Sequence, residues 1–397
     1  MVEWKKIEDF GSYFGGLTGK TKDDFVDGNA KFITYMNVFA NPSLDISSTG
    51  VVKINEGEKQ NKIQFGDILF TGSSETPDEA GMSCVVANEL DEDYYMNSFC
   101  FGIRLDNPKQ YNLHYLKHVL RSNDVRKKIS KSASGVTRFN ISKARFGKIQ
   151  IPIPSIEEQN RIVGILDTFT ASIDNLKEQI AQRRKQYEYY RDQLLDLEGK
   201  EGVEMKSCGE VCEVTDYVAN GSFATLRENV SYRQEPDYAV LVRTIDLSNN
   251  FDGDKVYIDE RAYKFLSKSS LFGGEIIINN IGAGVGQTFR CPYLKEKMSL
   301  GPNSILVRTP NNDFYYYWFN SIYGQNAMMK VVTPGAMPKF NKTGFKTITV
   351  PVPPLSEQQR IVDILDKFEA SIQNLEAQFS QREKQYEYYR NKLLTFE

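Results

Sequence analysis

The two histidines of this chain have the spacing of metal ligands, but their pattern is incomplete. His114 and His118, the only histidines, stand four residues apart on an expected helix, a spacing that can hold zinc. The residue after His114 is Tyr115, so the glutamate of a hydrolytic His-Glu-Xaa-Xaa-His motif is missing. No cysteine or third ligand lies near in sequence. We therefore interpret the pair as part of a basic helix face.

Two glycine-rich stretches have partial cofactor-loop patterns. Gly15-Gly-Leu-Thr-Gly-Lys-Thr21 has Phe14 where a phosphate-binding loop needs glycine, and no buried strand precedes it. Gly282-Ala-Gly-Val-Gly286 follows an expected strand, but no amphipathic helix comes after it. Neither Asn41-Pro nor Asn107-Pro continues to the (Asn/Asp)-Pro-Pro-(Tyr/Phe) tetrapeptide of DNA amino-methyltransferases. We expect glycine turns here, and no cofactor or metal in this chain.

Basic residues gather in two matched segments, although the net charge of the whole chain is −3. Residues 113–150 contain ten Lys or Arg and one acid, and residues 314–356 contain four Lys and no acid. A local basic face, more than total charge, is typical of nucleic-acid binding. The alternative is a solvated basic helix, which is less satisfactory for two equivalent segments.

Polar residues in and beside glycine-bounded loops of these segments are the candidate DNA contacts. Lys and Arg would bind phosphate, Arg suits guanine, and Asn or Gln suits adenine. Ordinary surface polarity is the alternative for each, and Asn140 or Asn341 could instead cap the turn before the last strand. The candidates are Ser73, Ser74, Arg138, Asn140, Lys143, Arg145, Gln287, Lys339, Asn341 and Lys342.

These candidates must be positioned by elements that occur twice. Residues 158–198 recur as 357–397, with 27 of 41 positions identical. Both copies carry apolar residues at alternating spacings of four and three, which predicts coiled-coil helices. A helix from Ser155 to Asp196 would be roughly 60 Å long. We expect a capping box at Ser155–Glu158, a C-cap at Gly199 and a start at Pro353-Pro354 for the second copy.

The two apolar seams predict one antiparallel intramolecular coiled coil with pseudo-twofold symmetry. The alternative, in which each helix packs only on its own domain, would leave two apolar stripes exposed. Arg183 and Arg382 interrupt the seams at equivalent places, where the stem would pack and the charge would reach water or a carboxylate. The seam residues are Ile162, Leu166, Phe169, Ile173, Leu176, Tyr187, Tyr190, Ile361, Leu365, Phe368, Ile372, Leu375, Tyr386 and Tyr389.

The segments between the helices are expected to be two distantly related domains. Short β-branched runs at 62–71, 275–281, 304–308 and 346–352 predict strands. Residues 112–129 and 313–332 predict helices. Gly135 in Ser-Gly-Val-Thr-Arg-Phe-Asn140 resembles Gly335 in Pro-Gly-Ala-Met-Pro-Lys-Phe-Asn341. The fold class is therefore α+β: mixed domains at 1–152 and 199–351 alternate with helices at 153–198 and 352–397.

Composition places the chain in a reducing cytoplasm. The five cysteines form no Cys-Xaa-Xaa-Cys pair, which indicates buried free thiols. No apolar run reaches 18 residues, and the N-terminus does not have the pattern of a signal peptide, so no membrane association is expected.

This order of two divergent domains and two near-identical helices resembles the specificity subunit of Type I restriction–modification systems. The motifs that carry the resemblance are Glu-Gln-Xaa-Arg-Ile-Val at the start of each helix, Lys-Gln-Tyr-Glu-Tyr-Tyr-Arg within it, and Gly-Asp-Ile-Leu-Phe-Thr-Gly-Ser-Ser-Glu-Thr at 66–76. The resemblance covers the whole chain, strongly on the helices and moderately on the domains.

The resemblance implies a non-catalytic subunit. Each domain, called a target recognition domain, would read half of a bipartite, asymmetric sequence in double-stranded DNA. The helices would fix the spacer and dock two modification subunits, which carry S-adenosylmethionine; restriction subunits, which use ATP and Mg²⁺, could join them. The alternative from the residues alone is a coiled-coil scaffold whose two globular ends bind proteins.

Overall fold

The structure is a computed structural model that describes residues 2–396, and its internal contacts divide the chain into two compact units. Unit 1 comprises Met1–Lys177 and Ala377–Glu397, and unit 2 comprises Glu178–Glu376. Each unit thus holds one of the two variable segments and part of each long helix. The expected four-segment division stays a prediction, and its outer limits, Met1 and Glu397, lie outside the described residues.

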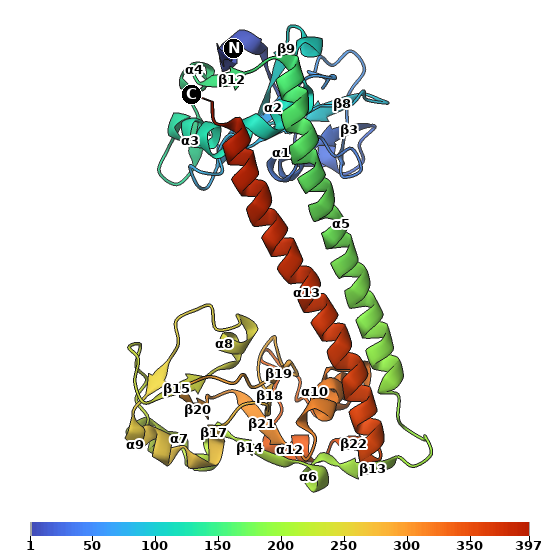
Figure 1. Cartoon of the computed structure of the whole chain (residues 1–397), viewed down its shortest axis with the longest axis vertical. Coiled ribbons are helices and arrows are strands. Elements are labelled where there is room, and N and C mark those ends of the chain that lie inside the picture. Colours follow the sequence, from blue (N-terminus) through green and yellow to red (C-terminus); the bar gives the residue numbers. More distant parts are fainter. Residues whose placement is uncertain (1, 397) are drawn as a thin grey trace. The chain divides into compact units, whose positions relative to one another are not determined.

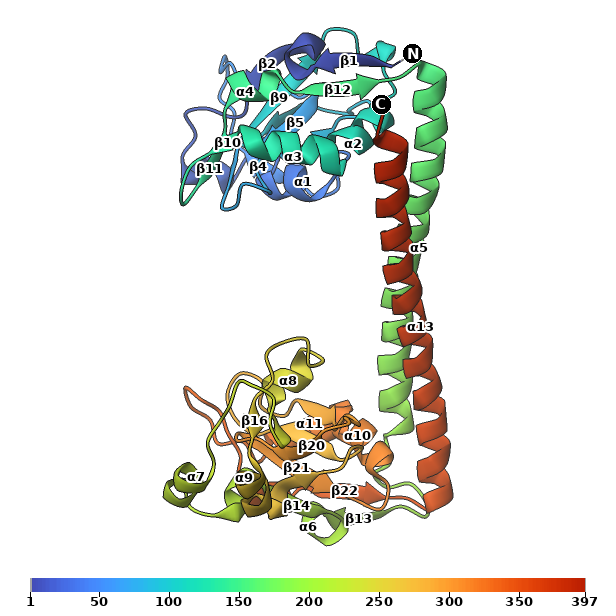
Figure 2. The same ribbon diagram turned by 60° about the vertical axis from the view of Figure 1, so that its left-hand side comes forward.

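The two long helices are α5 (Ile156–Leu194) and α13 (Leu355–Leu394), and in each unit their segments pair antiparallel (Figures 1 and 2). In unit 1 the ring of Phe169 stacks on Tyr389, with centroids 5.3 Å apart, and Lys177 lies over Phe379. In unit 2 Phe368 stacks on Tyr190 at 5.6 Å. The predicted antiparallel coiled coil is confirmed.

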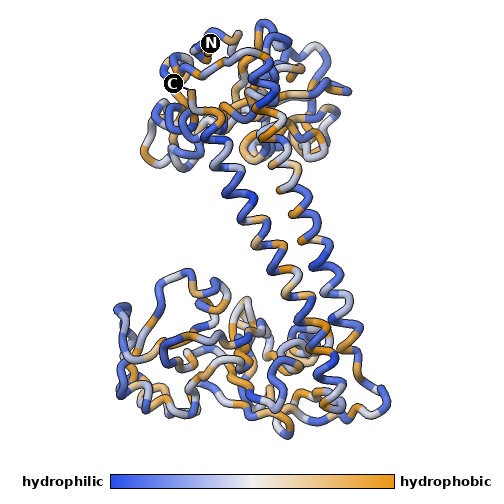
Figure 3. The backbone as a smooth tube through the Cα atoms, in the orientation of Figure 1, coloured by the Kyte–Doolittle hydropathy of each residue, from blue (hydrophilic) through white to orange (hydrophobic). Residues whose placement is uncertain are grey.

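Burial along the seam is deepest where a helix also meets its domain. Ile162, Leu166, Ile361 and Leu365 are fully buried, because they belong at once to the seam and to the domain cores. Further along, Phe169, Ile372 and Leu375 are half-buried, and Figure 3 shows apolar residues alternating with polar ones along both helices. Helix pairing and helix–domain packing therefore occur together.

The seam arginines contact aromatic rings, a partner that the expectation did not include. The guanidinium of Arg183 lies 5.9 Å from the centre of the Phe368 ring, and that of Arg382 lies 5.7 Å from Phe169. The charged heads thus rest on aromatic faces within the seam, and Arg382 also donates to the Gln385 side chain.

The helix ends confirm one of three predictions. Helix α13 begins directly after Pro354, whose carbonyl accepts from the Gln358 amide. The expected capping box is only half formed: the Glu158 amide donates to Ser155 Oγ at 3.4 Å, but the Glu158 carboxylate pairs with Arg161. The C-cap at Gly199 was wrong, because α5 ends at Leu194 and Gly199 (φ +75°) lies in the following turn.

Unit 1 is built on an antiparallel sheet in the order β2-β9-β5-β7. A second sheet, β4-β3-β8, contains the parallel pair β3 and β8, and β1 pairs with β12. A third small sheet has the order β10-β11-β6. The bounds are β1 Glu3–Lys6, β2 Gly11–Gly15, β3 Ala30–Ile33, β4 Gly50–Val52, β5 Ile68–Thr71, β6 Ser73–Ser74, β7 Ser83–Val85, β8 Tyr94–Met96, β9 Cys100–Leu105, β10 Ala133–Ser134, β11 Phe139–Ile141 and β12 Gln150–Ile153.

Unit 2 repeats this plan. Its main sheet runs β14-β21-β18-β19, its second sheet runs β16-β15-β20-β17 with β15 and β20 parallel, and β13 pairs with β22. The bounds are β13 Glu204–Ser207, β14 Glu213–Asp216, β15 Ala239–Val242, β16 Tyr257–Ile258, β17 Ser270–Leu271, β18 Ile276–Asn279, β19 Thr288–Arg290, β20 Lys297–Leu300, β21 Ser304–Arg308 and β22 Thr349–Val352.

The shorter helices break where polar residues interrupt the apolar pattern. The expected helix at 112–129 is two helices, α2 and α3, separated at Arg121-Ser122. The expected helix at 313–332 is likewise α10 and α11, and Ser321 caps the second by accepting from the Gly324 amide. The bounds are α1 Tyr35–Ala40, α2 Leu113–Leu120, α3 Asn123–Ser132, α4 Lys143–Gly147, α6 Cys208–Val211, α7 Phe223–Asn229, α8 Thr244–Ser248, α9 Glu260–Phe265, α10 Asn312–Asn320, α11 Ile322–Met329 and α12 Lys342–Lys346.

The expected strands are present but mostly shorter. The run at 304–308 matches β21, whereas the run at 62–71 is strand only at β5 and that at 346–352 only at β22. All five cysteines are free and buried, as predicted. Among residues 2–396, no helix is long and apolar enough to cross a membrane.

Candidate nucleic-acid interface

In unit 1, three segments far apart in sequence meet at one edge of the main sheet. The Gly72 amide donates to the Phe99 carbonyl at 2.7 Å, and the Ile141 amide donates to the Gly72 carbonyl at 2.9 Å. These bonds join the end of β5, the start of β9 and the β10–β11 hairpin (Figure 2). The hairpin carries two of the predicted DNA contacts, Arg138 and Asn140. We call this junction the reading centre of unit 1.

Unit 2 contains the same junction. The Asn280 amide donates to the Asn303 carbonyl at 3.2 Å, and the Phe340 amide donates to the Asn280 carbonyl at 3.1 Å. Asn280 therefore takes the place of Gly72, Asn303 that of Phe99 and Phe340 that of Ile141. We call this junction the reading centre of unit 2.

The matched bonds define the register between the two hairpin loops. Ser134 pairs with Asn140 in unit 1, and Thr333 bridges to Lys339 in unit 2. Asn140 is thus equivalent to Lys339, and Ser142 to Asn341. The two Phe-Asn pairs at the ends of the matched sequence runs are therefore offset by one residue in the structure.

The side chains at the two reading centres differ at four equivalent positions. On this register Arg138 corresponds to Met337. Ser73 pairs with Asn140, and Ile281 bridges to Lys339, so Ser73 corresponds to Ile281. The four pairs are Ser73 and Ile281, Phe99 and Asn303, Arg138 and Met337, and Asn140 and Lys339. One backbone arrangement therefore presents two different chemistries.

Arg138 is held at the centre of unit 1 by two contacts. Its Nε donates to Ser73 Oγ at 3.1 Å, and its guanidinium carbon lies 4.8 Å from the centre of the Phe99 ring. Arg138 and Ser74 also line an open hollow of about 460 Å³, whose walls include Tyr35 and Phe39. The predicted group Ser73, Ser74, Arg138 and Asn140 is thus brought together.

The other basic residues of unit 1 divide into exposed and structural groups. Lys143 and Arg145, on α4, are exposed, and Lys143 lies 5.3 Å from the Phe101 ring. Arg121 and Arg126 instead donate to backbone carbonyls, and burial lowers the pKa of each to about 10. The expectation that the whole basic segment forms one exposed face was therefore wrong for these two arginines.

The predicted contacts in unit 2 are brought together only in part. Lys339 and Asn341 line a hollow of about 310 Å³ with Asn303. The Asn341 side chain accepts from the Gly344 amide and caps α12, which was the alternative for this residue. Lys342 is half-buried and pairs with Asp216 at 3.2 Å. Gln287 is exposed after the turn that follows β18.

The histidine pair does not form an exposed basic face. His118 is 2% exposed, its Nε2 lies 2.7 Å from Asp167 Oδ1, and its Nδ1 lies 3.1 Å from the Tyr386 hydroxyl. Burial lowers the pKa of His118. Burial alone would raise the pKa of Asp167, but hydrogen bonds from His118 and Lys117 hold it well below its usual range. His118 therefore joins α2 to the long helices.

The partial cofactor motifs lie in turns. The first glycine stretch ends β2, and the second connects β18 to β19, with the Gly286 amide donating to the Asn279 carbonyl. Within the described part of the chain, no group of three or more His, Cys, Asp or Glu side chains is arranged to hold a metal ion.

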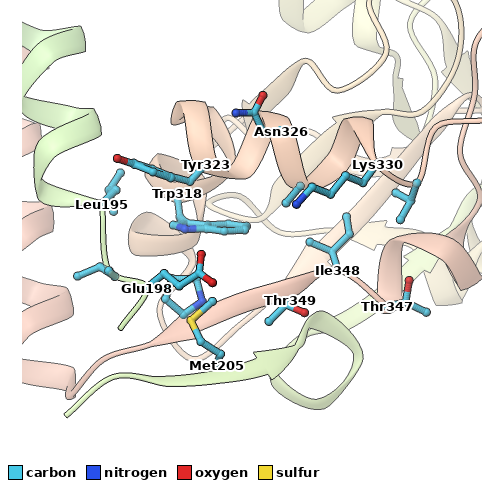
Figure 4. Close-up of a pocket in the computed structure, with 14 residues that line it drawn as sticks. Leu195, Glu198, Met205, Trp318, Tyr323, Asn326, Lys330, Thr347, Ile348 and Thr349 are labelled. Atoms are coloured by element: carbon cyan, nitrogen blue, oxygen red, sulfur yellow. The ribbon is translucent and has the colours of Figure 1, made fainter. Parts of the chain in front are cut away.

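A further hollow of about 470 Å³ lies in unit 2 beside the end of α5 and shares no lining residue with the reading centre (Figure 4). Trp318, Met205 and Lys330 are among its walls. In unit 1 Trp4 takes the strand position of Met205, since Trp4 lies opposite Pro152 and Met205 opposite Pro351. A tryptophan in unit 1 therefore stands where unit 2 has a methionine in the wall of this hollow.

The comparisons with known proteins identify the class. The family described as "Type I restriction modification DNA specificity domain" matches residues 1–183 and 200–382. This chain belongs to that family and contains its domain twice. The predicted family and α+β fold class are confirmed, and the protein-interaction scaffold is not favoured.

Among relatives, the chain is 31% identical over 263 residues to the EcoR124I/EcoR124II specificity subunit of Escherichia coli, a match that covers 63% of each protein. It is 24% identical over 404 residues to a putative MjaX specificity subunit of Methanocaldococcus jannaschii, covering 96% of this chain and 89% of that one.

Two solved structures share the fold. The S subunit of a Type I system from M. genitalium matches with a TM-score of 0.53 and 16% identity, covering 100% of this chain and 97% of that one. A chain from a study of complex assembly in a Type I system matches with a TM-score of 0.63 and 16% identity, covering 99% and 97%.

Sequence reasoning missed Phe99, Asn303 and Met337. Phe99 and Met337 are large exposed apolar residues, and Asn303 is one of three non-glycine residues with positive φ among residues 2–396. Exposure and backbone conformation are not visible in one sequence, so the sequence offered no signal for these residues.

Proposed function

We propose that this chain is the DNA-recognition subunit of a Type I restriction–modification complex and that each unit reads one half of a bipartite, asymmetric target in double-stranded DNA. The observation that carries the proposal is the duplicated reading centre, with the same backbone bonds and different side chains. Base-edge contacts specify sequence, so different side chains on one scaffold predict different half-sites.

The long helices fix the number of unread base pairs between the half-sites and bind two modification subunits. Support for docking comes from the repeated Gln-Tyr-Glu-Tyr-Tyr-Arg run, whose Tyr189 and Tyr388 are exposed at equivalent positions. Exposed aromatic residues that match in two copies are suited to two copies of one partner.

The chain itself performs no catalysis in this proposal. The modification subunits supply S-adenosylmethionine and adenine methylation, and restriction subunits, where they are present, supply ATP and Mg²⁺ chemistry. The incomplete catalytic motifs of the sequence support this division.

Methylation mapping tests the proposal. The full chain is co-expressed with its cognate modification subunits, and methylated adenines are mapped across the host genome. The expected motif has two unlike halves and a fixed gap. Inserting one heptad into each long helix adds roughly 10 Å, which should widen the gap by about three base pairs. A single continuous motif, or a motif that persists without this chain, would refute the proposal.

A further inference from the structure

The Arg138 side chain is held so that one edge remains available for a ligand. Its Nε is used by Ser73 Oγ, and its flat face rests on Phe99. This is the one hydrogen bond found for Arg138 among the described residues, so both terminal nitrogens keep their N–H donors. The side chain is exposed. Two contacts thus fix a cation whose outer edge carries unused donors.

This arrangement matches the chemistry of guanine. A guanidinium edge donates two parallel hydrogen bonds to the O6 and N7 atoms of guanine in the major groove. Holding the planar group on an aromatic face and a hydroxyl before binding reduces the entropy lost when the contact forms. The same fork also matches two oxygens of a phosphate, and the variants below distinguish the two contacts by whether the motif changes.

Unit 2 replaces each part of this arrangement. Ile281 stands where Ser73 stands, so it has no hydroxyl to hold an arginine, and Met337 takes the place of Arg138. Asn303 takes the place of Phe99 and has φ of +64°. Asparagine is one of the few residues other than glycine that adopt left-handed backbone readily.

The unit 2 side chains match an A·T pair. The Asn303 carboxamide has one donor and one acceptor, which fit the N6 and N7 atoms of adenine, and it is exposed. Met337 is 64% exposed and offers an apolar group for a thymine methyl.

We infer that the equivalent positions of the two reading centres specify a G·C pair in one half-site, through Arg138, and an A·T pair in the other, through Asn303 with Met337. The inference rests on the proposed function and adds which residues determine specificity and for which bases. Phe99 and Ser73 are positioning residues for Arg138.

Methylation mapping of single variants in the full complex tests the inference. Arg138→Met, which introduces the unit 2 residue, should relax one base pair of one half-site, and that pair should be G·C. Discrimination there should fall about fivefold to 150-fold, the range of ~1–3 kcal/mol per base contact. Asn303→Gly should relax one A·T pair in the other half. Glycine tolerates positive φ, so this change removes the amide without adding strain.

Two further variants separate base reading from charge. Arg138→Lys keeps the charge but loses the planar fork, so it should relax the same G·C pair. Phe99→Leu should give a smaller relaxation at that pair and leave every other pair unchanged. Arg145→Ala is the matched control, an exposed arginine of the same unit without this support; it should weaken DNA binding and its salt dependence while the motif stays the same.

The outcomes distinguish this inference from the proposed function. If the wild type methylates a two-part motif but Arg138→Met leaves that motif intact and weakens binding to all DNA equally, Arg138 is a phosphate contact and the inference fails. It also fails if the relaxed pair is A·T for Arg138 or G·C for Asn303. Absence of any two-part motif in the wild type would overturn the proposed function first.

Discussion

Replacing Arg121 with methionine should destabilise unit 1 and leave unit 2 unchanged. Arg121 follows α2, and its side chain donates to the carbonyls of Val38, Phe39 and Asn41, at the end of α1, and of Ser83 in β7. These four carbonyls lie 2.6–3.1 Å from its nitrogens. Methionine retains much of the stem and removes every donor.

The expected loss in the free energy of unfolding is about 3 kcal/mol, from a net ~1 kcal/mol for each of the three N–H groups, one on Nε and two on Nη2, that donate to these carbonyls. A domain has only ~5–15 kcal/mol of stability in total. At a typical urea dependence, such a loss lowers the denaturation midpoint by about 1.5 M. The cation is retained at neutral pH, since its pKa is about 10.

The chain's two tryptophans allow the units to be followed separately. Trp4 lies in unit 1 and Trp318 in unit 2. Urea denaturation is measured by fluorescence in Trp318→Phe and Trp4→Phe backgrounds, with and without Arg121→Met. The Trp4 transition should move and the Trp318 transition should not. Lys127→Met, at an exposed position of α3, is the control and should change the midpoint little.

A loss below ~1 kcal/mol, no larger than that of the Lys127 control, would show that the carbonyl contacts of Arg121 do not hold α1 on β7. Equal shifts of both tryptophan transitions would contradict the assignment of the effect to unit 1.

Two further predictions concern residues whose roles only the structure shows. Asn341→Ala should lower the free energy of unfolding of unit 2 by about 1 kcal/mol in urea denaturation, because it removes the cap of α12. Asn140→Ala should leave stability unchanged and alter methylation at one half-site. The reverse pattern would contradict the equivalence of Asn341 with Ser142. The stability of unit 1 should fall as pH drops from 7 towards 5. The pKa of His118 is lower in the folded state than its ordinary value of ~6.5 in the unfolded chain. The neutral imidazole therefore stabilises the fold above pH ~6.5, and this stability is lost as pH falls through the folded pKa. Lys117, Asp167, His114 and Tyr386 surround this group. In unit 2 the corresponding residue is Tyr317, which donates to Asp366 at 2.6 Å. His118→Tyr introduces that residue and should remove the dependence of unit 1 stability on pH. Persistence of the full pH dependence of the urea midpoint would contradict the prediction.

The long helices and their pairing could be predicted because their information is local and repeated. A seam at spacings of four and three defines a helix face without knowledge of the rest of the fold, and a second copy supplies the partner. Contacts such as Phe169 with Tyr389 and Phe368 with Tyr190 confirm that pattern. The start of α13 was also predictable, because proline restricts the backbone by its own ring.

The sequence by itself therefore determined the α+β order and the paired helices, which follow from periodicity and repetition, and its motifs carried the resemblance that gave the class. Only the tertiary structure decided which polar residues face solvent. Arg121 and His118 read as surface charges until their carbonyl and carboxylate partners are known, and those partners lie at least 38 and 49 residues away in sequence. The reading centres were beyond reach for the same reason: strand pairing brings residues near 72, 99 and 138 together, and a one-residue shift in that pairing exchanges one set of outward side chains for another.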